Sequence, residues 1–102
     1  MIESLSFIAE NHSKIDIKIL ALDVLAGVLE KDSQNASVKI ISKFLNSGED
    51  ELIFAGIAAA GFLSKERRKT ISLEISKLEI YNNRIKSAIQ SFRKAEPFLG
   101  EQ

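Results

Sequence analysis

Cysteine and tryptophan are absent from this 102-residue chain, and histidine occurs once, as His12. Without cysteine, the chain cannot form a disulfide, a thiolate metal site or a catalytic thiol. A single histidine leaves one candidate for histidine-based catalysis or metal binding, and its nearest acids, Glu10 and Asp16, flank a predicted turn. A histidine in such a turn is typical of a structural or solvated residue. We therefore expect a protein that is not an enzyme and that holds no cofactor and no metal ion.

Glycine is also scarce, with five residues, and none of them belongs to a phosphate-binding sequence. Gly56 and Gly61 lie inside an apolar stretch and lack the G-x-x-x-x-G-K-[ST] or G-x-G-x-x-G context that cradles a phosphate. They are predicted to be packing glycines. The acidic run Glu49–Glu51 fits a helix N-terminus, where negative charge is favourable, better than it fits a cation site.

Long apolar runs are missing as well. The longest, Leu52–Leu63, falls short of the roughly 18 to 20 residues that a membrane span needs. The first residues, Met1–Leu5, lack the basic segment and the small-residue cleavage site of a secretory signal, so we expect a cytoplasmic protein. With 45% hydrophobic and 27% charged residues, the composition is that of one folded domain over residues 1–102.

The net charge is zero, but the charged residues are unevenly distributed along the chain. Residues 1–63 hold five lysines and nine acids, whereas residues 64–95 hold nine basic residues and three acids. The densest basic cluster of the chain lies at a predicted helix N-terminus, although a helix N-terminus disfavours positive charge. The cluster consists of Lys65, Arg67, Arg68 and Lys69. Three interpretations stay open: a solvated or internally paired face, a surface that binds an acidic protein, or a nucleic-acid contact.

The spacing of apolar residues predicts an all-α protein of about five helices. A short first helix is followed by one over residues 14–31, which is apolar on two sides and is expected to lie between layers. Residues 32–35 are expected to separate it from a third helix, which ends at Asn46–Gly48. Residues 49–63 are almost wholly apolar and small, which predicts the central helix of the core.

An aliphatic seam with alternating spacings of four and three, the heptad period of a coiled coil, occupies the C-terminal third. The seam consists of Ile71, Ile75, Leu78, Asn82, Ile85, Ile89 and Phe92. It predicts one long helix, or two helices broken near Asn82 and Asn83. A buried asparagine in a seam fixes register or oligomeric state, whereas one at a helix break has no such role. Residues 71–75 also alternate with the period of a strand, but the heptad spacing extends much further, so we prefer the helix.

A weak internal repeat links the middle helices. Shifting the sequence along itself by 34 residues places Ala21–Leu29 over Ala55–Leu63, and Ile41–Phe44 over Ile75–Leu78. Over roughly residues 14–79, this pattern resembles the HEAT-type arrays of helical hairpins. The first unit carries the match, through Ile17-Lys18, Ala21-Leu22, Leu25, Val38, Ile41, Leu45 and the Asn46–Asp50 turn. The second unit departs from it, since Ala59 or Ala60 stands where the family has leucine.

The resemblance implies a right-handed stack of antiparallel helices that binds other macromolecules through the surface of its second helices, and it implies no catalytic residue. Our leading hypothesis is a non-catalytic protein–protein interaction module, such as an adaptor, an inhibitor or a chaperone-like protein. Its partner would be a protein, an acidic one if residues 65–69 form the binding surface. A homodimer or other homo-oligomer assembled through the 71–92 seam is one alternative. A weak nucleic-acid binder that uses the 65–69 cluster is another, and we expect no membrane partner.

Overall fold

The computed structural model describes residues 1–81 and 83–94 of the chain. Within that part the protein is helical and contains no strand, so the predicted all-α fold is confirmed and the strand alternative over residues 71–75 is wrong. The described part contains six α-helices and one 3-10 turn, against the five helices expected. They are α1 (Ile2–Asn11), α2 (Ile15–Gly27), α3 (Lys31–Leu45), α4 (Asp50–Ala60), α5 (Lys65–Tyr81), the turn η1 (Asn83–Ile85) and α6 (Lys86–Lys94).

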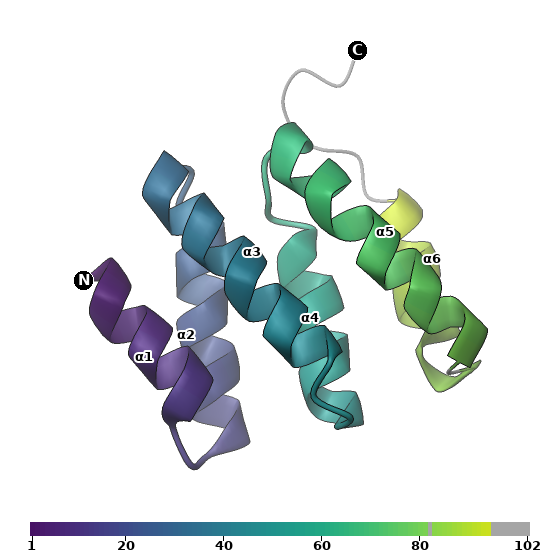
Figure 1. Cartoon of the computed structure of the whole chain (residues 1–102), viewed down its shortest axis with the longest axis horizontal. Coiled ribbons are helices and arrows are strands. Elements are labelled where there is room, and N and C mark those ends of the chain that lie inside the picture. The colour runs from purple at the N-terminus through teal and green to yellow at the C-terminus, as the bar shows by residue number, and fades with distance from the viewer. Residues whose placement is uncertain (82, 95–102) are drawn as a thin grey trace.

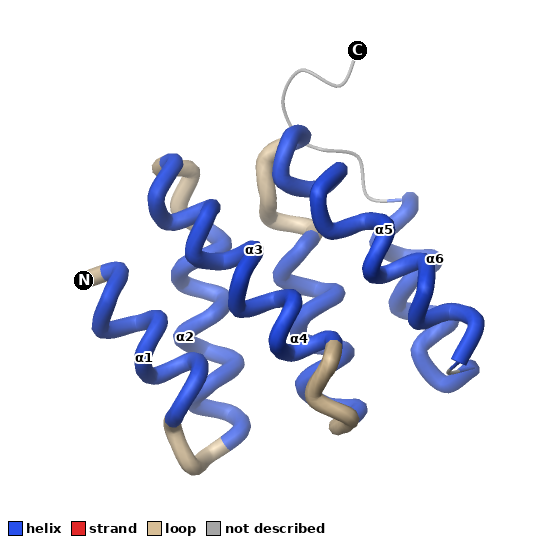
Figure 2. The backbone as a smooth tube through the Cα atoms, viewed as in Figure 1, coloured by secondary structure: helices blue, strands red, loops and turns tan. Residues whose placement is uncertain are grey.

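The helices form two layers, with α1, α3 and α5 in front and α2, α4 and α6 behind (Figure 1). Loops join them at alternating ends, so the chain is a row of three antiparallel hairpins (Figure 2). The sequence repeat had suggested hairpins that pair α2 with α3. In the structure α2 packs most extensively on α1, and α4 on α3. The short first helix supplies the missing partner, so the hairpins begin one helix earlier than the repeat suggested.

The α4 helix packs against α2, α3, α5 and α6, and α3 packs against α1, α2, α4 and α5, so the two helices share the centre of the core. Gly56 lets α4 approach α3 closely: a Cβ atom there would lie 3.2 Å from Phe44 Cβ and 3.3 Å from Leu45 Cδ2. Ala59 and Ala60 are fully buried on the same helix. The stop predicted at residues 46–48 is also confirmed, since α3 ends at Leu45 and Gly48 adopts a positive φ of 79°.

The segment 32–35, predicted to be a break, lies within the N-terminal part of α3, which begins at Lys31. Two of its side chains donate hydrogen bonds to backbone carbonyls at the end of α2, and the segment does not interrupt α3. Ser33 Oγ donates to the Leu25 carbonyl at 2.6 Å, and Gln34 Nε2 donates to the carbonyls of Ala26 and Val28 at 3.0 and 2.9 Å. These carbonyls lie at the end of α2, where the helix supplies no partner four residues later; the Leu25 carbonyl also accepts from the Val28 N–H at 3.4 Å. Polar residues that resemble N-caps of α3 therefore cap the C-terminus of α2.

The heptad seam is used inside one chain. The turn η1 (Asn83–Ile85) precedes α6, so α5 and α6 are two helices, and the seam faces the interior from both. Its members Ile71, Ile75, Ile85, Ile89 and Phe92 are buried, and Leu78 packs against them. Asn82 lies outside the described residues. Because these side chains are covered within one chain, the structure gives no support to a coiled coil or a dimer interface through the seam.

Candidate protein-binding surface

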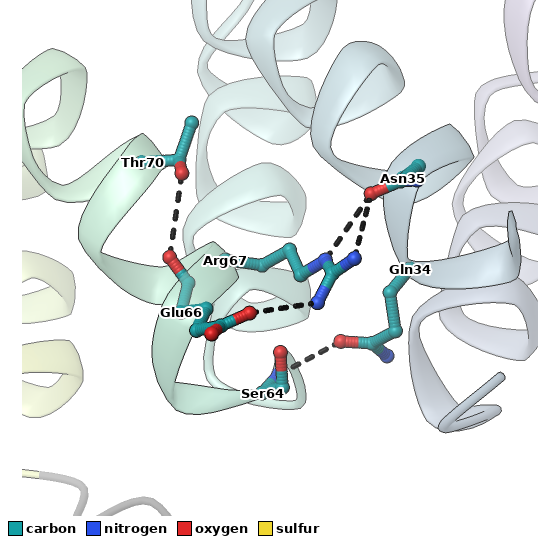
Figure 3. A network of polar contacts seen from close by, with 6 residues as sticks. All are labelled: Gln34, Asn35, Ser64, Glu66, Arg67 and Thr70. Atoms are coloured by element: carbon teal, nitrogen blue, oxygen red, sulfur yellow. Dashed lines mark hydrogen bonds and ion pairs between the residues drawn. The ribbon is translucent and has the colours of Figure 1, made fainter. Parts of the chain in front are cut away.

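The basic cluster at residues 65–69 lies at the start of α5, but its side chains do not form one surface. Arg67 extends toward α3, where its Nε and Nη2 both donate to Asn35 Oδ1 at 3.1 Å (Figure 3). Its Nη1 lies 3.4 Å from the Glu66 carboxylate. Only 21% of the Arg67 side chain is exposed. Arg67 therefore fastens α5 to α3.

Arg68 is buried, with 8% of its surface exposed. Its guanidinium carbon lies 4.7 Å from the centroid of the Phe92 ring, and Nη2 donates to the Phe92 carbonyl at 2.8 Å. That carbonyl belongs to the last turn of α6, where the helix dipole favours a cation. The positive charge of Arg68 is unfavourable at the N-terminus of α5, but it stabilises the C-terminal end of α6.

These contacts correct one premise of the basic-cluster hypothesis. Arg67 and Arg68 are not exposed binding residues, because both form contacts inside the protein, as the internally paired interpretation requires. Lys65 and Lys69 lie on the exposed side of the same helix turns. The four residues therefore do not form a continuous basic patch.

The other polar candidates also have structural contacts. His12 Nδ1 accepts a hydrogen bond from the Lys14 backbone N–H at 3.0 Å, within the turn between α1 and α2. In the acidic run, Asp50 and Glu51 occupy the first turn of α4, and Asp50 pairs with Arg84 at 3.1 Å. Across residues 1–81 and 83–94, no three side chains of the metal-binding types come together.

Large apolar side chains are exposed on the layer formed by α2 and α4. Leu20 is 60% exposed and Val24 43%, although the sequence predicted that α2 would be covered on two sides. Phe54 and Phe62, on α4 and the turn after it, are 39% and 57% exposed. The protein has only two layers, so the second apolar side of α2 has no helix to cover it.

These exposed residues repeat with the period of the hairpins. Residues on and just after α2 have counterparts 34 positions later on and just after α4, and α2 packs beside α4. The pairs are Leu20 with Phe54, Val24 with Ala58, and Val28 with Phe62. All six are exposed. We call this set the apolar face.

An open groove of about 240 Å³ continues the apolar face toward α6. Phe54, Ala58 and Gly61 line it on one side, and Ala88, Ser91 and Phe92 on the other. The lining includes no charged side chain. An apolar cavity of about 150 Å³ holds a benzene molecule, so this groove has room for one large apolar side chain.

The charged residues of α2 and α4 are mainly acidic, whereas α6, which lines the groove, carries Lys86, Arg93 and Lys94 and no acid. The α4 helix carries Asp50 and Glu51 and no basic residue. The α2 helix carries Asp16 and Asp23, and its single lysine, Lys18, is less exposed than Asp16. Burial raises the pKa of the Asp23 carboxyl above its ordinary value of 3.8.

Sequence reasoning missed the apolar face because it assigned both apolar sides of α2 and α4 to the core. The signal was present in the 34-residue repeat, which places Leu20 over Phe54 and Val28 over Phe62. A stack of two layers has no third layer to cover these positions. A repeated set of large apolar residues, beyond those that the layers can bury, indicates a surface.

Comparison with protein-family models, with curated proteins and with solved structures finds no match. Among the residues that the structure describes, no helix has the length and apolar character to cross a membrane.

Proposed function

We propose that this chain is a non-catalytic protein-interaction module that binds a protein partner through the apolar face. The observation that carries the proposal is the exposure of large apolar side chains at equivalent positions of successive hairpins. Leu20 on α2 and Phe54 on α4 are an example of such a pair, since both are exposed. Such a repeated surface is typical of helical stacks that present one binding face along the row.

The free energy of burying apolar side chains favours a partner that covers the apolar face. Burying a large apolar side chain contributes about 1.5 to 3 kcal/mol relative to leaving it in water. Monomeric proteins rarely expose contiguous apolar patches of more than a few hundred Å², and larger patches mark interaction sites. A partner that covered Leu20, Phe54 and Phe62 would therefore gain a contribution from each of these exposed side chains.

The alternatives have weaker support. Arg67 and Arg68 are engaged with Asn35 and Phe92, so the basic cluster offers a nucleic acid little beyond Lys65 and Lys69. Affinity for a phosphate backbone grows with the number of phosphates contacted, and two lysines contact few. A homo-oligomer built on the seam would have to expose residues that the core already uses.

Affinity capture from cells that make the protein tests the proposal, with two leucine variants as a matched pair. Leu20→Asp puts a charge on the apolar face, and Leu73→Asp makes the same change on α5, where Leu73 is 65% exposed. The unmodified chain and Leu73→Asp are expected to capture the same partner. Leu20→Asp should reduce that capture by about tenfold or more, because an apolar contact becomes a buried charge. Circular dichroism checks that both variants fold.

Capture that survives Leu20→Asp, or that is lost equally in Leu73→Asp, would contradict the proposal. Phe54→Asp provides a second site on the same face. If the proposal is correct, both face variants lose the same partner. A partner lost in only one of them does not cover the face as a whole.

A further inference from the structure

We infer that the apolar face binds a second copy of this chain, in a two-fold dimer that seats Leu20 of each copy in the groove of the other. The inference rests on the proposed function and names the partner. It is carried by the layer formed by α2, α4 and α6, which we call the back layer. An exposed apolar side chain and a groove lie on opposite sides of that layer, and acids and bases lie at its opposite ends.

The back layer has a projecting side chain on one side and a hollow of matching size on the other. Leu20 lies on α2, at one side of the row of helices, and is 60% exposed (Figure 1). The groove lies between α4 and α6, at the other side, and its volume of about 240 Å³ has room for a leucine side chain. A two-fold interface must be complementary to itself. An axis through the middle of the back layer meets this condition, because it places each Leu20 over the groove of the other copy.

The exposed charges follow the same diagonal. Loops join successive helices at alternating ends, so α2, α4 and α6 run in one direction (Figure 2). Asp16 and Glu51 are therefore exposed at one end of the back layer, in the first turns of α2 and α4, and Lys94 is exposed at the other end, where α6 stops. A two-fold axis normal to the layer reverses the direction of the helices. It brings Asp16 of each copy toward Lys94 of the other, and opposite charges then meet twice.

The other charges of the three helices are compatible with this arrangement. Lys86 begins α6, so the same rotation brings it toward the C-terminal half of α2 in the other copy, which holds Asp23. Three further charged residues have contacts inside the chain or lie half-buried. They are Asp50, Arg93 and Lys18.

The back layer is comparable in area with a standard dimer interface. Its longest helix, α2, has 13 residues, and three adjacent helices of at most this length cover roughly 20 by 30 Å. A standard interface buries about 800 Å² of accessible surface on each partner. The back layer therefore offers an interface of this order without a contribution from α1, α3 or α5.

Sedimentation equilibrium of the intact chain tests the inference. The unmodified chain is expected to be a dimer at micromolar concentration. Leu20→Asp should raise the dissociation constant of the dimer by about tenfold or more, because it puts a carboxylate into an apolar groove at two places. The matched control is Leu73→Asp on α5, in the other layer, which should leave the dimer unchanged. Circular dichroism checks that both variants fold.

An exchange of charges tests the orientation of the two copies. Asp16→Lys and Lys94→Glu should each weaken the dimer by about fivefold, because like charges then meet at both ends of the interface. The combined variant Asp16→Lys, Lys94→Glu should return the dissociation constant to within about twofold of its original value. Each substitution is unfavourable at its own helix end, so this recovery cannot come from helix stability. The control Glu3→Lys, Lys39→Glu changes exposed positions of α1 and α3 and should have no effect.

Disulfide cross-linking tests the contact itself, because the chain contains no cysteine of its own. A mixture of Leu20→Cys chains and Ser91→Cys chains is expected to form a disulfide between the two variants on mild oxidation. In the inferred dimer, position 20 of one copy lies against the groove wall of the other, and a disulfide needs such proximity. A mixture of Leu73→Cys and Ser91→Cys chains is the control and should not cross-link.

Several outcomes would overturn the inference. These are a monomer at all concentrations, a dimer that survives Leu20→Asp, a combined charge variant that does not recover, or equal cross-linking of the two mixtures. A monomer whose capture of a different protein depends on Leu20 would assign the apolar face to that protein and leave the proposed function standing. The proposed function fails separately, when capture from cells does not depend on Leu20.

Discussion

The side-chain oxygen of Gln34 accepts a hydrogen bond of 2.7 Å from the backbone N–H of Ser64, although the two residues lie 30 positions apart (Figure 3). The amide nitrogen of Gln34 donates to the Ala26 and Val28 carbonyls at the end of α2. One buried side chain therefore joins the loop after α2 to the loop before α5. This contact holds neighbouring hairpins in register at the end of the stack where both loops lie.

Replacing Gln34 by leucine should lower the free energy of unfolding by about 2 to 4 kcal/mol. The substitution leaves the Ala26 and Val28 carbonyls and the Ser64 N–H without this partner, and a buried unsatisfied group costs more than the lost bond itself. Urea unfolding followed by circular dichroism measures the change.

The matched control is Gln90→Leu, because Gln90 is exposed on α6. Its effect should stay within about 0.5 kcal/mol. Similar losses in both variants would mean that the Gln34 contacts do not stabilise the stack.

Two adjacent alanines of α4 should respond in opposite ways to enlargement. Ala59 is fully buried, so Ala59→Leu is expected to destabilise the protein by about 1 to 3 kcal/mol through overpacking. Ala58 lies on the apolar face, so Ala58→Leu should change stability by less than about 0.5 kcal/mol. Thermal unfolding of the two variants checks this contrast, and an unchanged midpoint for Ala59→Leu would place that side of α4 outside the core.

The helices could be predicted from the sequence because their apolar periodicity is a local signal. Residues 49–63 were identified as the central helix from composition alone; α4 does lie in the core, but α3 packs against as many helices, and Phe54 and Ala58 of α4 are exposed. The predicted break at residues 32–35 was wrong for a non-local reason. Ser33 and Gln34 have the side chains of N-caps, and only the position of α2 shows that they bond to its carbonyls instead.

The candidate site was harder to predict because exposure depends on how many layers the fold has. The seam from Ile71 to Phe92 and the stripe from Leu20 to Val28 both consist of apolar residues at helical spacing. Because α5 and α6 are antiparallel, the seam residues on them are buried inside the protein, whereas no helix layer covers the residues from Leu20 to Val28 that are exposed. The basic cluster was also misinterpreted as one surface, because the sequence did not show that Arg68 lies inside, against Phe92.

Arg68→Lys should destabilise the protein by about 1 to 3 kcal/mol even though the charge is kept. Lysine lacks the planar guanidinium that stacks on Phe92 while donating to its carbonyl. The matched control is Lys69→Arg, the same exchange of basic residues at the next, exposed position, which should change stability by less than about 0.5 kcal/mol. Urea unfolding of both variants decides the point, and equal stability of Arg68→Lys and the unmodified chain would show that the guanidinium geometry contributes nothing.

Asp23→Asn should stabilise the protein at neutral pH, by an amount that disappears on acidification. Burial raises the pKa of the Asp23 carboxyl in the folded state above its ordinary value of 3.8, so ionisation is harder in the folded than in the unfolded chain. Below pH 3.8 the carboxyl is protonated in both states and costs nothing. As the pH rises through the folded-state pKa, the folded chain loses stability relative to the unfolded chain, and asparagine avoids this loss.

The measurement is the difference in unfolding free energy between Asp23→Asn and the unmodified chain, from urea titrations between neutral pH and the acid limit of the fold. The difference should be positive at pH 7 and should shrink as the pH approaches the ordinary pKa of 3.8. Asp16→Asn is the control on the same helix. Its carboxylate is exposed in the first turn of α2, where it favours the helix dipole, so its removal should cost about 0.3 to 1 kcal/mol at pH 7. A stability gain in Asp23→Asn that does not change with pH would show that the packing of the side chain, and not its partly buried charge, is what destabilises the protein.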